Sequence, residues 1–372
     1  MQWFKSHVSR SVALWQKYER RLMIAGLTTG FIFDLIIADR PDSPTNNLFL
    51  LSYLAIAGAL IIFLNVRTMR REETHPEYQP LFLIFVLQFC FGGLASNMLV
   101  LYGRSGTFAA STLFFVLLAG MLVGNEFLRT RYAQLRFNIV VYYTLLLTYL
   151  IIAVPTFIFH AVGTWVFLAT GVISLLIIAF FLWVVYMLVL KGRDRAAQLY
   201  EVSFLVAFVF LLFNSLYFMR IIPPVPLSLK DIGIYHSLLR LPAPVEGNIY
   251  TATYEKPSWF VFWRGTSSTY SVTTPSEAVC YSSVYAPTGL TTPIFHRWEK
   301  YDEVAGEWKQ VFRTSFAISG GREGGFRGYT DSIVGPGKWR CNVETENGAL
   351  IGRTTFTVEE KPTPPELSQK TL

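Results

Sequence analysis

Long runs of apolar residues alternate with short polar segments over the first 222 residues of the chain. Seven of these runs approach the roughly 20 residues with which a helix spans the hydrocarbon core of a bilayer. A helix of that length in a soluble protein keeps one polar face, whereas these runs are apolar on every side. The pattern therefore predicts an all-α bundle of seven transmembrane helices, at about 21–38, 48–65, 81–101, 107–124, 138–159, 164–190 and 201–222.

The pattern changes at "IIPPVPLSL", where two adjacent prolines end the seventh span because proline cannot continue a helix. Residues 227–241 then place Ile232, Tyr235, Leu238 and Leu239 at helical spacing. This spacing predicts a short amphipathic helix on the outer membrane surface, followed by a Pro-rich linker. The interfacial helix and the linker together occupy residues 223–247.

From residue 248 to residue 360 the chain consists of short β-type segments separated by Gly, Pro and Asn. Many short strands over a region of this size are typical of an all-β, immunoglobulin-like sandwich. The tail at 361–372, "KPTPPELSQKTL", is rich in proline and is predicted to be disordered. The expected strands are 248–255, 259–264, 269–273, 277–285, 294–301, 308–319, 326–333, 338–345 and 350–358.

The distribution of positive charge predicts how the spans are oriented. The four polar segments on one side of the predicted membrane hold 14 Lys and Arg residues, and those on the other side hold two, Arg40 and Arg104. Because Lys and Arg accumulate in cytoplasmic loops, the N-terminus is predicted to be cytoplasmic and the β region to lie outside. The basic residues flank apolar runs, so the predicted partner is the lipid bilayer and not nucleic acid.

Three stretches of the β region carry a family resemblance: "APTGLTTPIFHRWEKYD", "GGREGGFRGYT" and "GKWRCNVETENGALIGRTTFTV". Together they resemble an uncharacterised family of bacterial inner-membrane proteins whose C-terminal module is a domain of unknown function. The resemblance covers roughly residues 220–360 and implies a bacterial inner membrane with a periplasmic module. It carries no catalytic or binding residue over to this chain. At the position of Cys341 the family pattern usually has an apolar residue such as Val.

Cys341 lies on the same side of its predicted strand as Trp339 and Val343, within the apolar set. Cys90 falls inside the third predicted span, so Cys280 is the one cysteine that could pair with Cys341. In an oxidising periplasm the two would form a structural disulfide. The family's apolar residue at this position favours two buried free thiols instead, and the sequence leaves both interpretations open.

Polar residues near the outer ends of the spans are candidates for a membrane-embedded site: Asp34, Asn97, Arg104 and Arg220. A carboxylate in hydrocarbon costs several kcal/mol unless it is paired or hydrated. Asp34 and Arg220 are at matching predicted depth, which suggests an ion pair between them. The alternative is that these residues serve helix packing or reach to the membrane interface.

Two stretches of the β region are candidates for contact with a ligand or partner. "WFVFW" places Trp259 and Trp263 on one face of a strand, where they would contact a glycan, a ligand or the domain core. "GGREGGFRGYT" offers Arg322 and Arg327 to an anionic or polar partner, or serves as a flexible connection. It lacks the GK[ST] of a phosphate-binding loop.

The sequence contains no HExxH, GxSxG, SxxK or CxxC motif, and its five histidines are scattered. No metal and no cofactor is therefore predicted, and enzymatic activity is not favoured. The sequence favours a non-enzymatic inner-membrane protein whose periplasmic β-sandwich binds an envelope protein or glycan. The alternative is transport, or the handling of lipid or glycan, at the polar residues of the spans.

Overall fold

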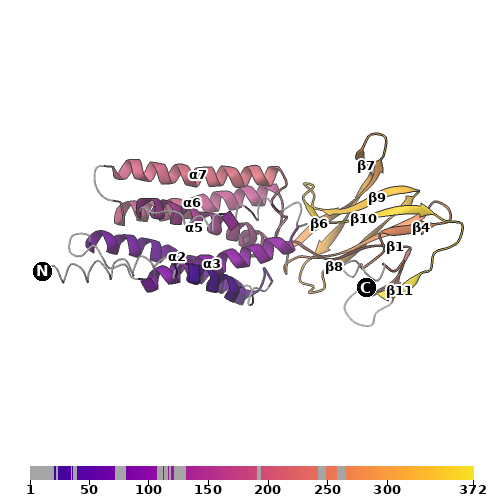
Figure 1. Cartoon of the computed structure of the whole chain (residues 1–372), viewed down its shortest axis with the longest axis horizontal. Coiled ribbons are helices and arrows are strands. Elements are labelled where there is room, and N and C mark those ends of the chain that lie inside the picture. The colour runs from indigo at the N-terminus through magenta and orange to yellow at the C-terminus, as the bar shows by residue number, and fades with distance from the viewer. Residues whose placement is uncertain are drawn as a thin grey trace. The chain divides into compact units, whose positions relative to one another are not determined.

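The computed structural model divides the chain into two compact units, one built from helices and one from strands (Figure 1). The residues that the structure describes are 21, 24–34, 36, 40–71, 81–106, 112, 116, 119–120, 131–190, 194–241, 249–257 and 265–372.

Five helices among the described residues are long and apolar enough to cross a membrane. A shorter apolar helix covers Ile24–Asp34, within the first predicted span. The fourth predicted span, at 107–124, lies largely outside the described residues, so the count of seven stays a prediction. The long helices are α2 (Pro44–Arg71), α3 (Leu81–Arg104), α5 (Arg131–Ala153), α6 (Thr164–Leu188) and α7 (Arg195–Phe218), and a π-helical turn, η2 (Val154–Phe159), continues α5.

Glycines let the 24–34 helix approach α3 until the backbones touch. A Cβ atom built on Gly30 would lie 2.1 Å from the carbonyl oxygen of Phe89. A Cβ built on Gly92 would lie at the same distance from the carbonyl oxygen of Leu27. Small residues at such crossings are typical of packed membrane helices, because lipid itself provides no hydrophobic force between them. This contact holds the end of the 24–34 helix beside α3.

Two sheets share one core in the β unit, one in the strand order β1-β5-β8 and one in the order β4-β10-β9-β6-β7. Strand β4 runs parallel to β10, and the other neighbouring strands in these two sheets are antiparallel. The strands are β1 (Ser228–Tyr235), β2 (Ser237–Leu241), β3 (Ile249–Tyr254), β4 (Thr269–Val272), β5 (Ser276–Tyr285), β6 (Thr291–Asp302), β7 (Glu307–Ser319), β8 (Phe326–Val334), β9 (Gly337–Glu344), β10 (Leu350–Glu360) and β11 (Ser368–Thr371).

The core between the two sheets is built from alternate residues of each strand. Trp298 and Cys341 come from the five-stranded sheet, and Ile234 and Cys280 come from the three-stranded sheet. Cys280 and Cys341 form a disulfide that links β5 to β9. Because side chains of a strand alternate between its faces, this inward set sends the residues between them to the outer faces.

A third sheet, in the order β11-β3-β2, packs against the β1-β5-β8 sheet on the side away from that core. Tyr235 of β1 and Tyr281 of β5 meet Tyr250 and Ala252 of β3 in a buried, largely aromatic cluster. Strands β1 and β5 are therefore packed on both faces.

The predicted interfacial helix at 227–241 is wrong, because this segment forms strands β1 and β2. Strand β1 pairs with β5 through seven residue pairs, including Ile234 with Cys280, and β2 pairs with β3. Ile232 and Tyr235 lie three positions apart and so face opposite sides of β1. Both sides are packed, Ile232 against the core between the two main sheets and Tyr235 in the cluster with β3. The β region consequently begins at residue 228 and not at 248.

The predicted disordered tail at 361–372 is wrong as well. Its last residues form β11, which pairs antiparallel with β3, and Leu372 exchanges two backbone hydrogen bonds with Tyr250. The sequence prediction followed the prolines, and it missed that β3 offers an edge to which the segment after them can pair. The predicted strand at 259–264 lies outside the described residues.

Candidate functional site

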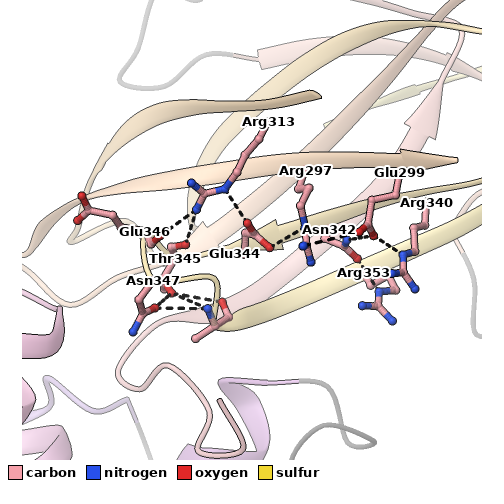
Figure 2. A network of polar contacts seen from close by, with 11 residues as sticks. Arg297, Glu299, Arg313, Arg340, Asn342, Glu344, Thr345, Glu346, Asn347 and Arg353 are labelled. Carbon is pink, nitrogen blue, oxygen red and sulfur yellow. Dashed lines mark hydrogen bonds and ion pairs between the residues drawn. The ribbon is translucent and has the colours of Figure 1, made fainter. Parts of the chain in front are cut away.

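The outer face of the five-stranded sheet carries a connected set of charged side chains (Figure 2). We call this set the charged face. Register places three arginines in one row across four strands, because Arg297 of β6 is paired with Arg313 of β7 and with Asn342 of β9, and Asn342 is paired with Arg353 of β10. The charged face consists of Arg297, Glu299, Arg313, Arg340, Asn342, Glu344 and Arg353.

Glu344 joins two of these arginines on one side of the row. Its Oε1 lies 2.7 Å from the Nε of Arg313, and its Oε2 lies 3.1 Å from the Nε of Arg297. Arg313 also donates Nη2 hydrogen bonds to the backbone carbonyls of Thr345 and Glu346, at 3.1 and 3.0 Å. The Glu344 side chain is only 3% exposed. Two guanidinium groups therefore neutralise a carboxylate that is almost fully buried.

Glu299 occupies the corresponding place on the other side of the row. It accepts hydrogen bonds from Arg340 Nε and from Asn342 Nδ2, and its Oε1 lies 3.6 Å from Arg297 Nη1. Burial by itself would raise the pKa of Glu299, but the hydrogen bonds from Arg340 and Asn342 outweigh burial and hold the pKa below its usual range. Glu299 is therefore ionised at neutral pH.

Arg353 has a different environment from the other three arginines. Its Nε donates a hydrogen bond of 2.5 Å to Asn342 Oδ1, and neither carboxylate of the charged face reaches it within an ion-pair distance. Partial burial lowers the pKa of its guanidinium, and repulsion from Arg340 lowers it further. The four arginines and two glutamates of the charged face leave a surplus of two positive charges.

Aromatic rings border the charged face along β6 and β7. The Cζ of Arg340 lies 4.3 Å from the centre of the Trp308 ring, and the Cζ of Arg313 lies 3.7 Å from that of Phe295. Trp308 also packs edge-on against Tyr301, at 5.2 Å between ring centroids. Stacking on a ring holds a guanidinium in one orientation while its N–H edge stays available for a ligand.

The disulfide lies in the core beneath this face. The Cα atoms of Cys280 and Cys341 are 6.5 Å apart and the two residues form a disulfide. The structure therefore supports the disulfide over two buried free thiols. His296 is fully buried beside it, with Nε2 2.8 Å from Ser282 Oγ and Nδ1 2.9 Å from Thr330 Oγ1.

The sulfur atoms and a ring nitrogen of Cys280, His296 and Cys341 lie within 4.8 Å of one another, a spacing that a metal ion could use. In the disulfide the two sulfurs are bonded to each other, so thiolate ligands are not available in this oxidised form. Burial lowers the pKa of His296 to about 3. The imidazole is therefore neutral at physiological pH and acts as a hydrogen-bonded core residue.

The structure brings two of the predicted membrane candidates together. Asp34 is 1% exposed and its side chain hydrogen-bonds to that of Asn97. Asn97 and Asn46 form a reciprocal amide pair, with Asn97 Nδ2 2.7 Å from Asn46 Oδ1 and Asn46 Nδ2 3.4 Å from Asn97 Oδ1. The second oxygen of Asp34, Oδ2, is buried and has no hydrogen-bond partner among the described residues.

The predicted ion pair between Asp34 and Arg220 is wrong, since Asp34 bonds to Asn97 and Arg220 is exposed. Arg220 follows α7 in a left-handed conformation, with φ of 60°, which turns the chain away from the helix. Arg104 is exposed at the end of α3. The sequence analysis missed Asn46, because a lone amide at the start of an apolar run gives no sign of its partner.

Of the four predicted contact residues of the β region, the structure describes two, and neither belongs to the charged face. Trp259 and Trp263 are outside the described residues. Arg322 is exposed with its Cζ 5.6 Å from the Phe326 ring, and Arg327 is half-buried on β8, paired with Ser283 of β5. Arg322 lies in the loop between β7 and β8, and Arg327 lies on β8 of the β1-β5-β8 sheet.

The sequence analysis missed the arginines of the charged face. They occur in "HRWEKYD", "VFRTSF", "KWRCNVE" and "GRTTF", at positions that are ordinarily on the solvated side of a strand. The one available signal was that four separate strands each carry an arginine there. Only their register shows that the side chains meet.

The fold defines the class of protein as a chain with several helices of membrane-spanning length and a C-terminal all-β domain. A family model described as a protein of unknown function, DUF2914, matches residues 291–358, so the chain carries a domain of this uncharacterised family. The matched region begins at the first residue of β6, ends within β10 and includes every residue of the charged face.

No curated protein matches the chain. One similar solved structure is the alkylpurine DNA glycosylase AlkC of Pseudomonas fluorescens, bound to DNA containing an abasic site analog. It is 12% identical and the alignment covers 86% of this chain and 99% of that chain, with a TM-score of 0.19. That score is too low to support an argument about fold or function.

Proposed function

We propose that this chain is a non-enzymatic protein of a bacterial inner membrane that presents an immunoglobulin-like sandwich to the periplasm. The distribution of Lys and Arg supports a cytoplasmic N-terminus. The disulfide between Cys280 and Cys341 supports an oxidising compartment for the β unit, because such bonds are rare in the cytosol.

Three features support the immunoglobulin-like assignment. Cysteines on β5 and β9 bridge the two sheets, and Trp298 on β6 packs in the same core cluster. The intervening strand order, with β9 and β6 adjacent in one sheet and β5 in the other, corresponds to the B, C and F strands of that fold. In each of the two sheets, the strand that comes first in the chain lies at an edge. These edge strands are β1 in one sheet and β4 in the other, which is a further similarity to the immunoglobulin fold.

The β unit binds an envelope partner or ligand through the charged face. The observation that carries this proposal is the surplus of two positive charges on a sheet face where Glu299 and Glu344 are already buried and engaged. A sheet that needed only solubility would carry its charges exposed and interspersed. Here the carboxylates of Glu299 and Glu344 are buried with their arginine partners. Removing charged groups from water costs free energy, and solubility alone does not require it.

A photocrosslinking amino acid at a single position of the full-length protein, expressed in its native membrane, tests this proposal. The test position is Val311 on β7, two residues before Arg313 of the charged face, where the side chain is 50% exposed. The matched control is Ile333 on β8 of the other sheet, which is 70% exposed. We expect a discrete adduct from position 311 and none of the same mass from position 333. Identical adduct patterns, or no adduct at 311, would contradict the proposal.

A second candidate function is a membrane-embedded activity, in transport or in the handling of lipid or glycan, centred on Asp34. The unpartnered Oδ2 atom favours it, because a buried carboxyl group without a partner is costly in an apolar bundle. The test is Ser96→Cys in a Cys90→Ser background, since Ser96 is buried one residue from Asn97. Labelling by a membrane-impermeant maleimide would indicate a water path to this site. Absence of labelling would leave Asp34 as a packing residue.

A further inference from the structure

The row of arginines on the charged face is an unfavourable arrangement unless something compensates it. Side chains paired across antiparallel strands lie about 5 Å apart, and like charges at such positions destabilise a sheet. Arg313 and Arg297 are directly paired, and only Asn342 separates Arg297 from Arg353. Glu344 offsets the repulsion between Arg313 and Arg297, because it lies within 3.1 Å of both.

At the other end of the row, neither Glu299 nor Glu344 lies within ion-pair distance of Arg353. Glu299 faces Arg297, Arg340 and Asn342, so its two oxygens are already occupied. Asn342 gives Arg353 a neutral oxygen in place of a carboxylate. Figure 2 shows the outer edge of the Arg353 guanidinium directed away from the other residues of the network, with no contact drawn to it. Arg353 is also exposed, so a ligand can reach that edge.

We infer that the charged face binds an oxyanion of its ligand, a carboxylate or a phosphate, through the free edge of the Arg353 guanidinium. A guanidinium presents two parallel N–H groups at the spacing of a carboxylate or phosphate, and such a bidentate contact is stronger than a neutral hydrogen bond. The hydrogen bond from Nε to Asn342 holds the fork in place before the ligand arrives. Arg340, stacked on Trp308, adds a second positive charge close by. This inference rests on the proposed function and specifies the chemistry of the ligand.

Isothermal titration calorimetry on the full-length protein in detergent tests the inference, with inorganic phosphate and citrate as probes at constant ionic strength. We expect saturable binding of at least one probe, and a loss of at least about tenfold in affinity for Arg353→Ala, the effect of removing one charge-assisted hydrogen bond. Arg353→Lys should fall between wild type and Arg353→Ala, because lysine keeps the charge without the fork. Arg322→Ala is the matched control, an exposed arginine of the same domain outside the charged face.

Four results distinguish this inference from the proposed function. No saturable binding of either probe, or equal loss in Arg353→Ala and Arg322→Ala, would overturn the inference. A Val311 adduct that persists unchanged in Arg353→Ala would overturn it too, while leaving the proposed function in place. Probe binding that depends on Arg353, without any Val311 adduct, would support the anion site and contradict the proposed partner. The thermal midpoint of Arg353→Ala without probe shows that the variant is folded.

Discussion

Cys280 and Cys341 join the two sheets of the β unit at the level of Trp298, which packs in the same buried cluster. The bridge spans a sequence separation of 61 residues. The chain-entropy model assigns a loop of that length a stabilisation of about 4 kcal/mol. Cys341→Val should therefore lower the thermal midpoint of the β unit clearly under oxidising conditions.

Reductant provides the control for this prediction. It should lower the midpoint of the wild type to about that of Cys341→Val and leave the variant unchanged. If the two cysteines acted only as small buried hydrophobes, Cys341→Val would be nearly neutral, because valine fills similar space. Differential scanning fluorimetry with and without reductant distinguishes the two outcomes.

The buried imidazole of His296 should make the stability of the β unit depend on pH. Burial lowers the pKa of His296 from 6.5 to about 3, so between these values the unfolded chain binds a proton that the folded chain does not. The free energy of unfolding should thus fall as pH decreases from 6.5 towards 3, by up to about 1.4 kcal/mol per pH unit. Above pH 6.5 the imidazole is neutral in both the folded and the unfolded chain, so His296 causes no loss of stability there.

Denaturant unfolding at a series of pH values measures this slope. His296→Asn removes the titrating group, and its stability should change less with pH over the same window even if it is lower throughout. Parallel pH profiles for the wild type and the variant would show that His296 does not carry the effect.

Glu344→Gln tests the electrostatics of the charged face. The substitution keeps the shape of the side chain but leaves Arg297 and Arg313 facing each other without the carboxylate that lies between them. Removing one partner of a buried ion pair typically costs about 3 kcal/mol or more, so the thermal midpoint should fall. Glu346→Gln is the matched control, because Glu346 contributes its backbone carbonyl to the network. Equal effects of the two substitutions would contradict the prediction.

Gly30→Val should disrupt the helical unit. The new side chain would meet the backbone of Phe89, which is not a flexible group that can move aside. The 24–34 helix would have to separate from α3, with loss of the contact between Asp34 and Asn97. Gly120→Val is the control, since a Cβ atom there meets none of the described residues within 4 Å. Size-exclusion profiles and thermal midpoints of the purified variants should differ, and a Gly30→Val protein as stable as the control would count against the crossing.

Reporter fusions test the proposed orientation. A reporter that is active only in the periplasm should be active when fused after Leu372, where β11 remains intact, and inactive when fused after Arg195. We expect this orientation because 14 Lys and Arg residues lie in the segments predicted to be cytoplasmic, and such residues accumulate in cytoplasmic loops. The opposite pattern of activity would reject both the count of seven spans and the periplasmic position of the β unit.

The sequence by itself determined the helical unit and most of the sheet strands. Five of the predicted apolar runs each overlap a long helix: 48–65, 81–101, 138–159, 164–190 and 201–222. A segment in lipid must hydrogen-bond its own backbone groups, and its length and apolar composition show that it can do so as a helix. The expected strands from 269 to 358 also overlap β4 to β10. Alternation and turn residues encode such strands locally, and Gly348, with φ of 77° in the turn before β10, is one example.

Only the tertiary structure decided what pairs with what. Residues 227–241 fit an amphipathic helix or a strand that is packed on both faces, and pairing of β1 with β5 selected the strand. The tail became β11 for the same reason, because β3 lies ready to pair with it. Asn46 and Asn97 lie 51 positions apart, and the charged face draws residues from four strands. Such contacts depend on register and helix crossing, which are set by packing over the whole domain and leave no local signal in the chain.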